Sequence, residues 1–251
     1  MEIKLDFSGY VAMCSGGASG MGLLAGQKFA ASGAKVVLCD INESAVLAAA
    51  AEICASGGEA IGLQVDVREY SQIAQAVKTT VDKFGRVDYL INAAGGASSR
   101  IFQCSNAFRD RDPEILSWGL DVNLKGALLF DRAVIGQMLD QKHGVIIHFG
   151  SVSGEEPSPS CPDYAASKSA MHGLTKAIAA YGAPHVRCCC VVPGPVLTRP
   201  GMANMKTPLG RAAEPWELVD FILYLCDDKH GGFFTGSSHV LDGGRLLANY
   251  K

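Results

Sequence analysis

Short apolar runs alternate along the chain with longer segments of helical spacing, and no other feature constrains the fold as strongly. The apolar runs occupy residues 10–14, 35–39, 60–65, 89–91, 145–149, 186–192 and 239–241. Each is long enough for a strand and too short for a buried helix, and most are continuously apolar, as is typical of strands covered on both faces. The segments between them predict helices at 21–31, 43–55, 71–84, 113–139, 163–181 and 215–226. This alternation predicts a single α/β domain over residues 1–251, with a doubly wound parallel sheet of about seven strands and helices on both faces.

Composition places the chain among globular proteins and excludes several other classes. Its 251 residues are 48% hydrophobic and 19% charged, with a formal net charge of −3. A largely disordered chain would be less apolar and more highly charged, and a nucleic-acid-binding protein would show a basic excess. No run of about 18 uncharged apolar residues is present, as a membrane span requires, and no secretory signal is evident. We therefore expect a cytoplasmic protein with neither a nucleic-acid nor a membrane partner.

The spacing of cysteine and histidine residues predicts no metal site. The nine cysteines form no Cys-x-x-Cys pair, and three are consecutive at 188–190 within an apolar run. Alternate side chains of a strand point to opposite faces, so this triplet suits neither a disulfide framework nor a zinc site. The six histidines are scattered without a metal-ligand spacing. We expect free, buried thiols in a reducing compartment and a packed His148.

A glycine-rich turn follows the first predicted strand and opens the first predicted helix. Residues 15–22 read Ser-Gly-Gly-Ala-Ser-Gly-Met-Gly. Glycines permit a tight turn and a close backbone approach to a pyrophosphate, and the helix N-terminus supplies free N–H groups and positive dipole. This turn is therefore predicted to bind the phosphates of a dinucleotide. The residues expected to line it are Ser15, Gly16, Ser19, Gly20, Met21 and Gly22.

Asp40, at the end of the second predicted strand, indicates which dinucleotide is bound. A carboxylate at this position can accept hydrogen bonds from both hydroxyls of an adenosine ribose and would repel a 2′-phosphate. Ile41 and Asn42 follow it, so no basic side chain is at hand to bind a phosphate. The sequence therefore predicts NAD in preference to NADP. Asp66, after the third strand, is expected to reach the adenine.

Tyr164 and Lys168 carry the strongest signal for chemistry. At a spacing of four residues they share one face of a predicted helix. An ammonium group beside a phenol favours the phenolate, so Lys168 is expected to lower the pKa of Tyr164. Ser151, just past the fifth predicted strand, is placed to donate a hydrogen bond to a substrate oxygen. Together with the glycine turn and Asp40, these residues predict acid–base chemistry beside a bound dinucleotide.

With these motifs the chain resembles the short-chain dehydrogenase/reductase family, in its single-domain NAD(P)-dependent branch with a Rossmann fold, over nearly its whole length. The motifs are the turn at 15–22, Asn-Ala-Ala-Gly at 92–95, Asn123, Ser151, Tyr-x-x-x-Lys at 164–168, and the segments 193–198 and 240–244. Ser15 stands where the family usually has Thr, and Ala93 replaces the second Asn of its Asn-Asn-Ala-Gly motif. The further cofactor contacts that the resemblance implies are Ile41, Asp66, Val67, Asn92, Ala93, Gly95, Tyr164, Lys168, Pro193, Gly194, Val196 and Thr198.

The resemblance also implies a role for each member of a catalytic tetrad. Tyr164 would exchange a proton with the substrate oxygen, and Ser151 would orient and polarise that oxygen. Lys168 would hold the nicotinamide ribose, and Asn123 would hold a water behind it. Departures from the family pattern include Gly150, where many relatives have a second Ser, and the short segment 198–208, which predicts an open substrate pocket. Glu155 and Glu156 are expected to be a solvated loop pair.

Three functions remain open from the sequence. The first is an NAD-dependent oxidoreductase that interconverts a secondary alcohol and a ketone, with a sugar or polyol, a hydroxysteroid or a cyclic alcohol as substrate. The second is a 3-oxoacyl thioester (acyl-carrier-protein) reductase, whose usual phosphorylated cofactor Asp40 disfavours. The third is a dinucleotide sensor without catalysis. Leucines at 116, 120, 124 and 128 recur every four residues and predict a subunit interface, so we expect a homo-oligomer, a tetramer in preference to a dimer.

Overall fold

Seven parallel strands form one sheet in the computed structural model, which describes residues 5–205 and 207–250. The strands lie in the order β3-β2-β1-β4-β5-β6-β7. They span β1 Val11–Ser15, β2 Lys35–Asp40, β3 Glu59–Gln64, β4 Tyr89–Asn92, β5 Gly144–Phe149, β6 Val186–Pro193 and β7 Ser238–Leu241. Ala12 of β1 pairs with Val36 on one side and with Tyr89 on the other. The strand order reverses between β1 and β4, so the predicted doubly wound sheet is confirmed, and ligands of such sheets bind at the carboxyl ends of the strands near this reversal.

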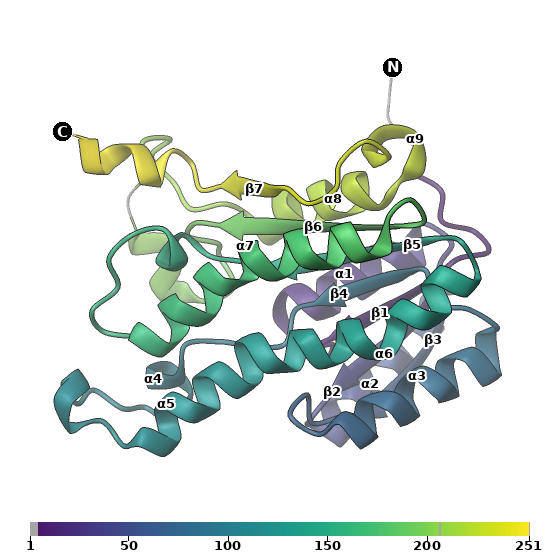
Figure 1. Cartoon of the computed structure of the whole chain (residues 1–251), viewed down its shortest axis with the longest axis horizontal. Helices are drawn as coiled ribbons and strands as arrows, with labels where there is room; N and C mark the ends of the chain where they lie inside the picture. Colours follow the sequence, from purple (N-terminus) through teal and green to yellow (C-terminus); the bar gives the residue numbers. More distant parts are fainter. Residues whose placement is uncertain (1–4, 206, 251) are drawn as a thin grey trace.

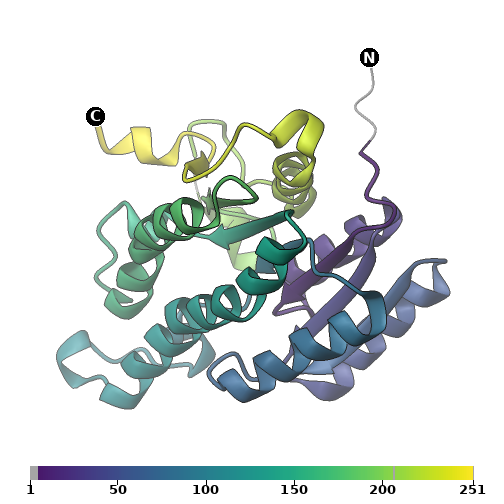
Figure 2. The same ribbon diagram turned by 45° about the vertical axis from the view of Figure 1, so that its right-hand side comes forward.

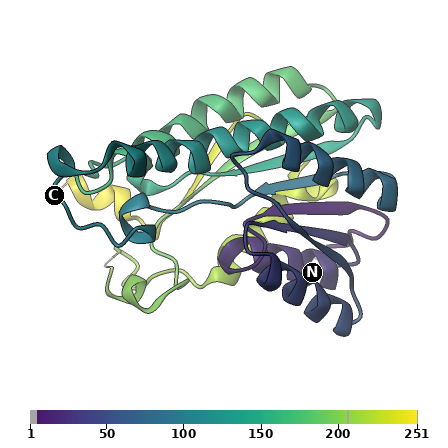
Figure 3. The same ribbon diagram turned by 90° about the horizontal axis from the view of Figure 1, so that it is seen from below.

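Helices cover both faces of the sheet, as Figures 1 and 3 show. One face packs against α1 Gly20–Ala31, α2 Glu43–Ala55 and α8 Pro215–Cys226. The other packs against α3 Tyr70–Phe84, α6 Gly126–Asp140 and α7 Pro162–Gly182. Figure 2 shows α6 and α7 side by side over the sheet. The five inner strands are therefore buried on both faces, which explains their largely apolar sequences, whereas the edge strands β3 and β7 are partly exposed.

The expected single helix over 113–139 is wrong in one respect. The segment divides into α5 Pro113–Leu120, a π-helical turn η2 Asp121–Lys125, and α6. The side-chain amide of Asn123 donates a hydrogen bond of 2.8 Å to the Gly119 carbonyl, so the wide turn places this side chain against the preceding helix. Such π-turns within helices are frequent at functional sites, and this one carries a residue of the predicted tetrad.

Short elements without a clear sequence signal gather at the carboxyl edge of the sheet. In Figure 1 the arrowheads of β6 and β7 point left, toward α4 Ser98–Ile101, α5 and the start of α7. The other short elements are η1 Phe108–Asp110, η3 Val152–Gly154, η4 Pro200–Asn204, α9 Asp228–Gly231 and η5 Arg245–Tyr250. With the exception of α9, they follow the strand ends from which the site is built.

The nine cysteines are free thiols, as expected. Seven are buried, including the triplet 188–190, whose side chains divide between the clusters on the two faces of the sheet. The expectation of burial is wrong for Cys54, which is exposed near the end of α2, and for Cys104, which is partly exposed after α4. Burial raises the pKa of the Cys14 thiol to about 12, so this sulfur stays protonated and acts as a small apolar group.

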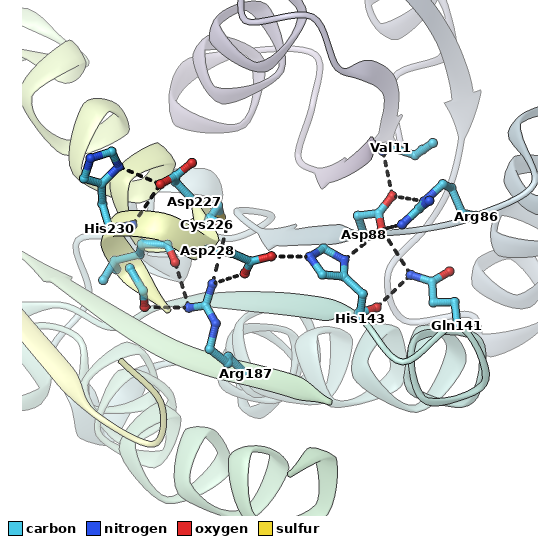
Figure 4. A network of polar contacts seen from close by, with 12 residues as sticks. Val11, Arg86, Asp88, Gln141, His143, Arg187, Cys226, Asp227, Asp228 and His230 are labelled. Atoms are coloured by element: carbon cyan, nitrogen blue, oxygen red, sulfur yellow. Dashed lines mark hydrogen bonds and ion pairs between the residues drawn. The ribbon is translucent and has the colours of Figure 1, made fainter. Parts of the chain in front are cut away.

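A chain of charged groups ties the strands together at the edge opposite the site (Figure 4). Asp88 accepts hydrogen bonds from Arg86 at 2.6 Å and from the Val11 backbone at 2.9 Å. His143 lies between two carboxylates, with Nδ1 at 2.9 Å from Asp88 and Nε2 at 3.0 Å from Asp228. Asp228 in turn accepts from Arg187 of β6. These contacts, which we call the basal clamp, connect the starts of β1, β4, β5 and β6.

Candidate active site

The glycine-rich turn between β1 and α1 is built so that backbone, not side chains, lines it. Gly16 has a φ of +65°, and a Cβ there would lie 2.8 Å from the Ala94 Cα. A Cβ on Gly22 would collide with the Gly16 carbonyl oxygen. No side chain caps the N-terminus of α1, since the N-cap Ser19 makes no such hydrogen bond. The turn therefore brings free N–H groups and a positive helix end to its surface, which fits a pyrophosphate.

Asp40 lies beside this turn at the end of β2. One carboxylate oxygen accepts from the Ala18 N–H at 3.1 Å, and the other accepts from the Asn42 N–H at 3.0 Å. Each carboxylate oxygen can accept more than one hydrogen bond, so the group can still receive ribose hydroxyls. Ile41, 59% exposed, stands next to it. The predicted ribose-binding position is thus joined directly to the predicted phosphate-binding turn.

Asp66 follows β3, and its carboxylate is occupied by a neighbour. Arg68 donates to it from Nε at 2.9 Å and from a terminal nitrogen at 2.5 Å, and these hydrogen bonds lower the pKa of Asp66. Nothing in the sequence indicates this pairing, and contact of Asp66 with adenine stays a prediction. Val67 packs against α6, where a Cβ on Gly126 would lie 2.8 Å from its methyl carbon.

The loop after β4 passes close to two members of the predicted tetrad. A Cβ on Gly95 would collide with the Asn123 side-chain oxygen and would lie 3.9 Å from the Lys168 Nζ. Asn123 accepts a hydrogen bond from the Gly96 N–H at 2.8 Å and donates to the Gly96 carbonyl at 3.0 Å. Its amide therefore fixes this loop against the π-turn. Glycine is required at position 95, because any side chain there would displace Asn123.

Tyr164, Lys168 and Ser151 meet at the end of β5. The Lys168 Nζ lies 5.6 Å from the centre of the Tyr164 ring and donates to the Phe149 carbonyl at 2.8 Å. The Ser151 side chain is hydrogen-bonded to Tyr164, and this contact acts to lower the tyrosine pKa. Ser151 also receives the Ser153 N–H at 3.1 Å, which orients its hydroxyl. The three predicted side chains therefore form one cluster around the phenol.

The expected lowering of the Tyr164 pKa by Lys168 is wrong in this structure. Burial raises the pKa of Tyr164 above its ordinary value of 10.0, and the opposing effects come from Ser151, Arg199 and Arg100. Burial also lowers the pKa of Lys168 to about 8. The physical reason is desolvation, which disfavours the charged form of both groups. At neutral pH the phenol is therefore protonated and is placed to act as a proton donor.

The segment after β6 forms the last part of the candidate site at the carboxyl edge of the sheet. A Cβ on Gly194 would lie 2.7 Å from the Asp242 Cα, so this position also requires glycine. Val196 bridges to Ala213, and Thr198 is an exposed residue whose hydroxyl donates to the Val196 carbonyl at 3.4 Å. The predicted cofactor contacts Pro193, Gly194, Val196 and Thr198 end or follow β6, just as Asn92, Ala93 and Gly95 end or follow β4. All predicted site residues thus lie at the carboxyl edge of the sheet or in the elements that begin there.

Comparison with known proteins agrees with this geometry. A family profile described as short chain dehydrogenase matches residues 10–208. The chain is 36% identical to the 3-alpha-(or 20-beta)-hydroxysteroid dehydrogenase of Mycobacterium tuberculosis, over 95% of this chain and 90% of that protein. It is 34% identical to the 3-oxoacyl-(acyl-carrier-protein) reductase of Synechocystis, over 94% and 97%. The crystal structure of a short-chain type dehydrogenase/reductase from Mycobacterium marinum is similar, with a TM-score of 0.86 at 31% identity over 96% of each chain.

The chain belongs to the short-chain dehydrogenase family. Members of this family are oxidoreductases that act on CH–OH groups with nicotinamide dinucleotides. Within residues 5–205 and 207–250, no three His, Cys, Asp or Glu side chains are grouped so as to hold a metal ion. None of the helices in the same residues is long and apolar enough to cross a membrane.

One of two carboxylates near the site of this short-chain dehydrogenase differs from expectation. Glu155 and Glu156 are expected to be solvated, yet Glu156 accepts hydrogen bonds from two nitrogens of Arg245, the shortest at 2.6 Å. Glu155 is exposed, as expected, and lies 2.6 Å from the His172 Nε2. The Glu156 contact joins the loop after β5 to the C-terminal turn η5. The two partners are 89 residues apart, so only the tertiary fold brings them together.

A network of buried polar side chains connects the strands and helices that carry the site. Asp131 of α6 accepts from the Asn92 side chain at 2.9 Å and lies 3.0 Å from the His148 Nε2. The His148 Nδ1 lies 2.9 Å from the Thr175 hydroxyl of α7. The expectation that His148 is packed in the core is confirmed. Asn92 was predicted as a cofactor contact, and in the structure its side chain also links β4 to α6.

Proposed function

We propose that the protein is an NAD-dependent oxidoreductase that interconverts a secondary alcohol and a ketone, with Tyr164 as the acid–base group. The observation that carries this proposal is the cluster of Tyr164, Ser151 and Lys168 at the end of β5, on the edge that bears the glycine-rich turn. The turn accommodates only backbone, and α1 begins without a side-chain cap, so both fit a dinucleotide. When bound, the nicotinamide supplies the hydride acceptor or donor.

Each residue of the cluster then has a defined task. Protonated Tyr164 gives its proton to the carbonyl oxygen during reduction, and the phenolate takes the hydroxyl proton during oxidation. Ser151 donates a hydrogen bond to the same oxygen and holds it near the phenol. Lys168 is anchored by the Phe149 carbonyl at 2.8 Å, and its ammonium would hold the nicotinamide ribose. Asn123 acts through its hydrogen bonds to Gly96, which fix the loop after β4.

A screen for NADH formation over polyols, sterols and cyclic alcohols tests this function. We expect turnover in at least one class, with hydroxysteroids favoured by the similarity to a hydroxysteroid dehydrogenase. The similarity to a 3-oxoacyl-(acyl-carrier-protein) reductase favours a second candidate, reduction of an acyl thioester. NADPH-dependent reduction of a 3-oxoacyl thioester, without oxidation of any alcohol by NAD, would support that second candidate. Tight NAD binding with no turnover in either assay would support the sensor function.

The cofactor preference depends on Asp40. We expect wild-type protein to bind NAD at least about tenfold more tightly than NADP, because a 2′-phosphate beside this carboxylate is repelled by a few kcal/mol at an effective dielectric constant of about 20. Asp40→Asn removes the charge and keeps an oxygen that accepts the Ala18 N–H, so it should reduce the preference for NAD over NADP. Asp40→Arg should reduce this preference further. Calorimetric titration of both cofactors measures the ratio.

The matched control for this experiment is Asp82→Asn, which changes the same charge on the distant helix α3. It should leave the ratio of the two affinities within about twofold of wild type, since exposed charges so far apart are screened by salt. Equal affinity of the wild-type protein for NAD and NADP would contradict the assignment of Asp40.

We also propose a cytoplasmic homo-oligomer, a tetramer in preference to a dimer. The leucine stripe of the sequence is partly uncovered in the single chain, with Leu120 41% and Leu128 46% exposed. Exposed leucines about two helical turns apart suit a symmetric, self-complementary contact. Sedimentation at micromolar concentration should give an oligomer for the wild type and a smaller species for Leu128→Arg. A monomeric wild-type protein would refute assembly through this stripe.

A further inference from the structure

Two arginines differ from all the others in the chain. Eight of the ten arginines, all of which lie within the described residues, are hydrogen-bonded or ion-paired to other side chains or to backbone carbonyls. These eight are Arg68, Arg86, Arg109, Arg111, Arg132, Arg187, Arg211 and Arg245. Arg100 and Arg199 have no hydrogen bond or ion pair with any described residue, and both are exposed.

Both unpaired guanidinium groups lie near enough to the phenol of Tyr164 to act on it electrostatically. Arg100 is on α4, just after the loop that follows β4, and Arg199 is between Thr198 and Pro200, in the segment that follows β6. Each acts electrostatically on the Tyr164 hydroxyl, and each is close enough to the other for Arg199 to lower the pKa of Arg100 further, beyond the effect of partial burial. Two segments 99 residues apart thus bring positive charge to one hydroxyl.

The Arg100 side chain lies against the loop that follows β4. A Cβ on Gly96 would lie 2.5 Å from a terminal nitrogen of Arg100, so the guanidinium lies directly over this glycine. The Gly96 N–H is held by Asn123 at 2.8 Å. The guanidinium therefore lies beside the loop that Asn123 of the tetrad holds in place. The carboxylate of Asp163 is not an ion-pair partner of Arg100, because that side chain faces Gly119 and lies 3.9 Å from Arg111.

Two like charges beside one phenol repel each other, and an anion bound between them relieves this repulsion. The guanidinium fork matches the two oxygens of a carboxylate, or those of a phosphate, better than any neutral group. We propose that Arg100 and Arg199 bind an anionic group of the substrate, a carboxylate attached a few bonds from the reacting carbon. This inference rests on the proposed function and names its substrate class: a secondary alcohol or ketone that carries an acid group.

A binding measurement tests the proposal without requiring turnover. Calorimetry would compare cyclohexane carboxylate, its methyl ester and cyclohexyl phosphate, each titrated into the wild-type protein saturated with NAD. We expect the carboxylate to bind about ten- to a hundredfold more tightly than the ester. Arg100→Gln and Arg199→Gln should each weaken carboxylate binding about tenfold and leave ester binding within about twofold. Tighter binding of the phosphate with the same arginine dependence would support the anion site and identify phosphate as its ligand.

The matched control is Arg109→Gln, which removes an exposed arginine paired with Asp110 outside the site. It should bind all three probes as the wild type does. Equal binding of carboxylate and ester, or unchanged carboxylate affinity in both arginine variants, would overturn the proposal. Weaker NAD binding in Arg100→Gln or Arg199→Gln would also overturn it, because the guanidinium groups would then serve the cofactor's phosphates.

The outcome separates this proposal from the proposed function. If the arginine variants still oxidise a neutral alcohol with NAD and bind no anion differently, the substrate class is wrong while the oxidoreductase function stands. If the wild type binds the carboxylate through both arginines but oxidises neither the alcohols of the screen nor a hydroxycyclohexane carboxylate, the anion site stands and the proposed function fails.

Discussion

Tyr164→Phe is expected to reduce turnover of a good alcohol substrate by about two to four decades, while NAD affinity stays within about threefold of wild type. The substitution keeps the ring, which packs beside Lys168, and removes only the hydroxyl that exchanges the proton. Because the phenol pKa is raised by burial, the phenolate is scarce at neutral pH. The oxidation rate of the wild type should therefore rise with pH, whereas the reduction rate should be high at neutral pH. Steady-state rates in both directions, with calorimetric titration of NAD, measure this.

The matched control for Tyr164→Phe is Tyr181→Phe, near the other end of the same helix, where the side chain is 67% exposed. This variant should keep wild-type turnover and the wild-type pH dependence. Near wild-type turnover of Tyr164→Phe on a good substrate would show that another group transfers the proton, and the sensor function would have to be reconsidered.

His143→Gln is expected to lower the free energy of unfolding by about 2 kcal/mol near pH 6, and by less as the pH rises. Burial alone would lower the pKa of His143, but its hydrogen bonds to Asp228 and Asp88 prevail and raise it from 6.5 to about 9. A rise of this size corresponds to at most about 3 kcal/mol, and solvent screening of a partly exposed group reduces this to about 2 kcal/mol. Denaturant unfolding at several pH values measures the difference between the two proteins.

The direction of this pH dependence follows from proton linkage. The folded protein holds the His143 proton more tightly than the unfolded chain, so the stabilisation is complete below pH 6.5 and is lost as the pH rises through about 9. His185→Gln is the control, since that ring is exposed and makes no side-chain hydrogen bond with the described residues. A stability difference for His143→Gln that grows between pH 7 and 9.5 would be incompatible with a protonated histidine in the basal clamp.

The sheet and the tetrad were predictable because their signals are local. Each strand is a short apolar run, and the spacing of four between Tyr164 and Lys168 places both on one helix face. The glycines at 16 and 22 were predictable for the same reason, because one tight turn requires a residue without a Cβ at each of these positions. The carboxyl edge then brings these local motifs together, because parallel strands all end at the same side of a sheet.

The features that sequence reasoning missed depend on tertiary contacts or on burial. Arg100 and Arg199 lie on a short helix and a loop without periodicity, so nothing in the sequence joins them to Tyr164. The raised tyrosine pKa follows from desolvation, which an ion-pair argument between neighbours on one helix leaves out. The π-turn was hidden because the leucines at 116, 120, 124 and 128 keep a regular spacing through it.

The most direct test of the central claim is the transfer of an isotope from substrate to cofactor. An alcohol labelled with deuterium at its carbinol carbon would be oxidised by the wild-type protein with NAD, and the NADH formed would be analysed by mass spectrometry. For the wild type we predict one deuterium in each NADH and a ketone product. Under the same conditions we predict that Tyr164→Phe forms neither labelled NADH nor ketone. Ketone formed with unlabelled NADH, or labelled NADH formed at the wild-type rate by Tyr164→Phe, would contradict hydride transfer coupled to proton exchange at Tyr164.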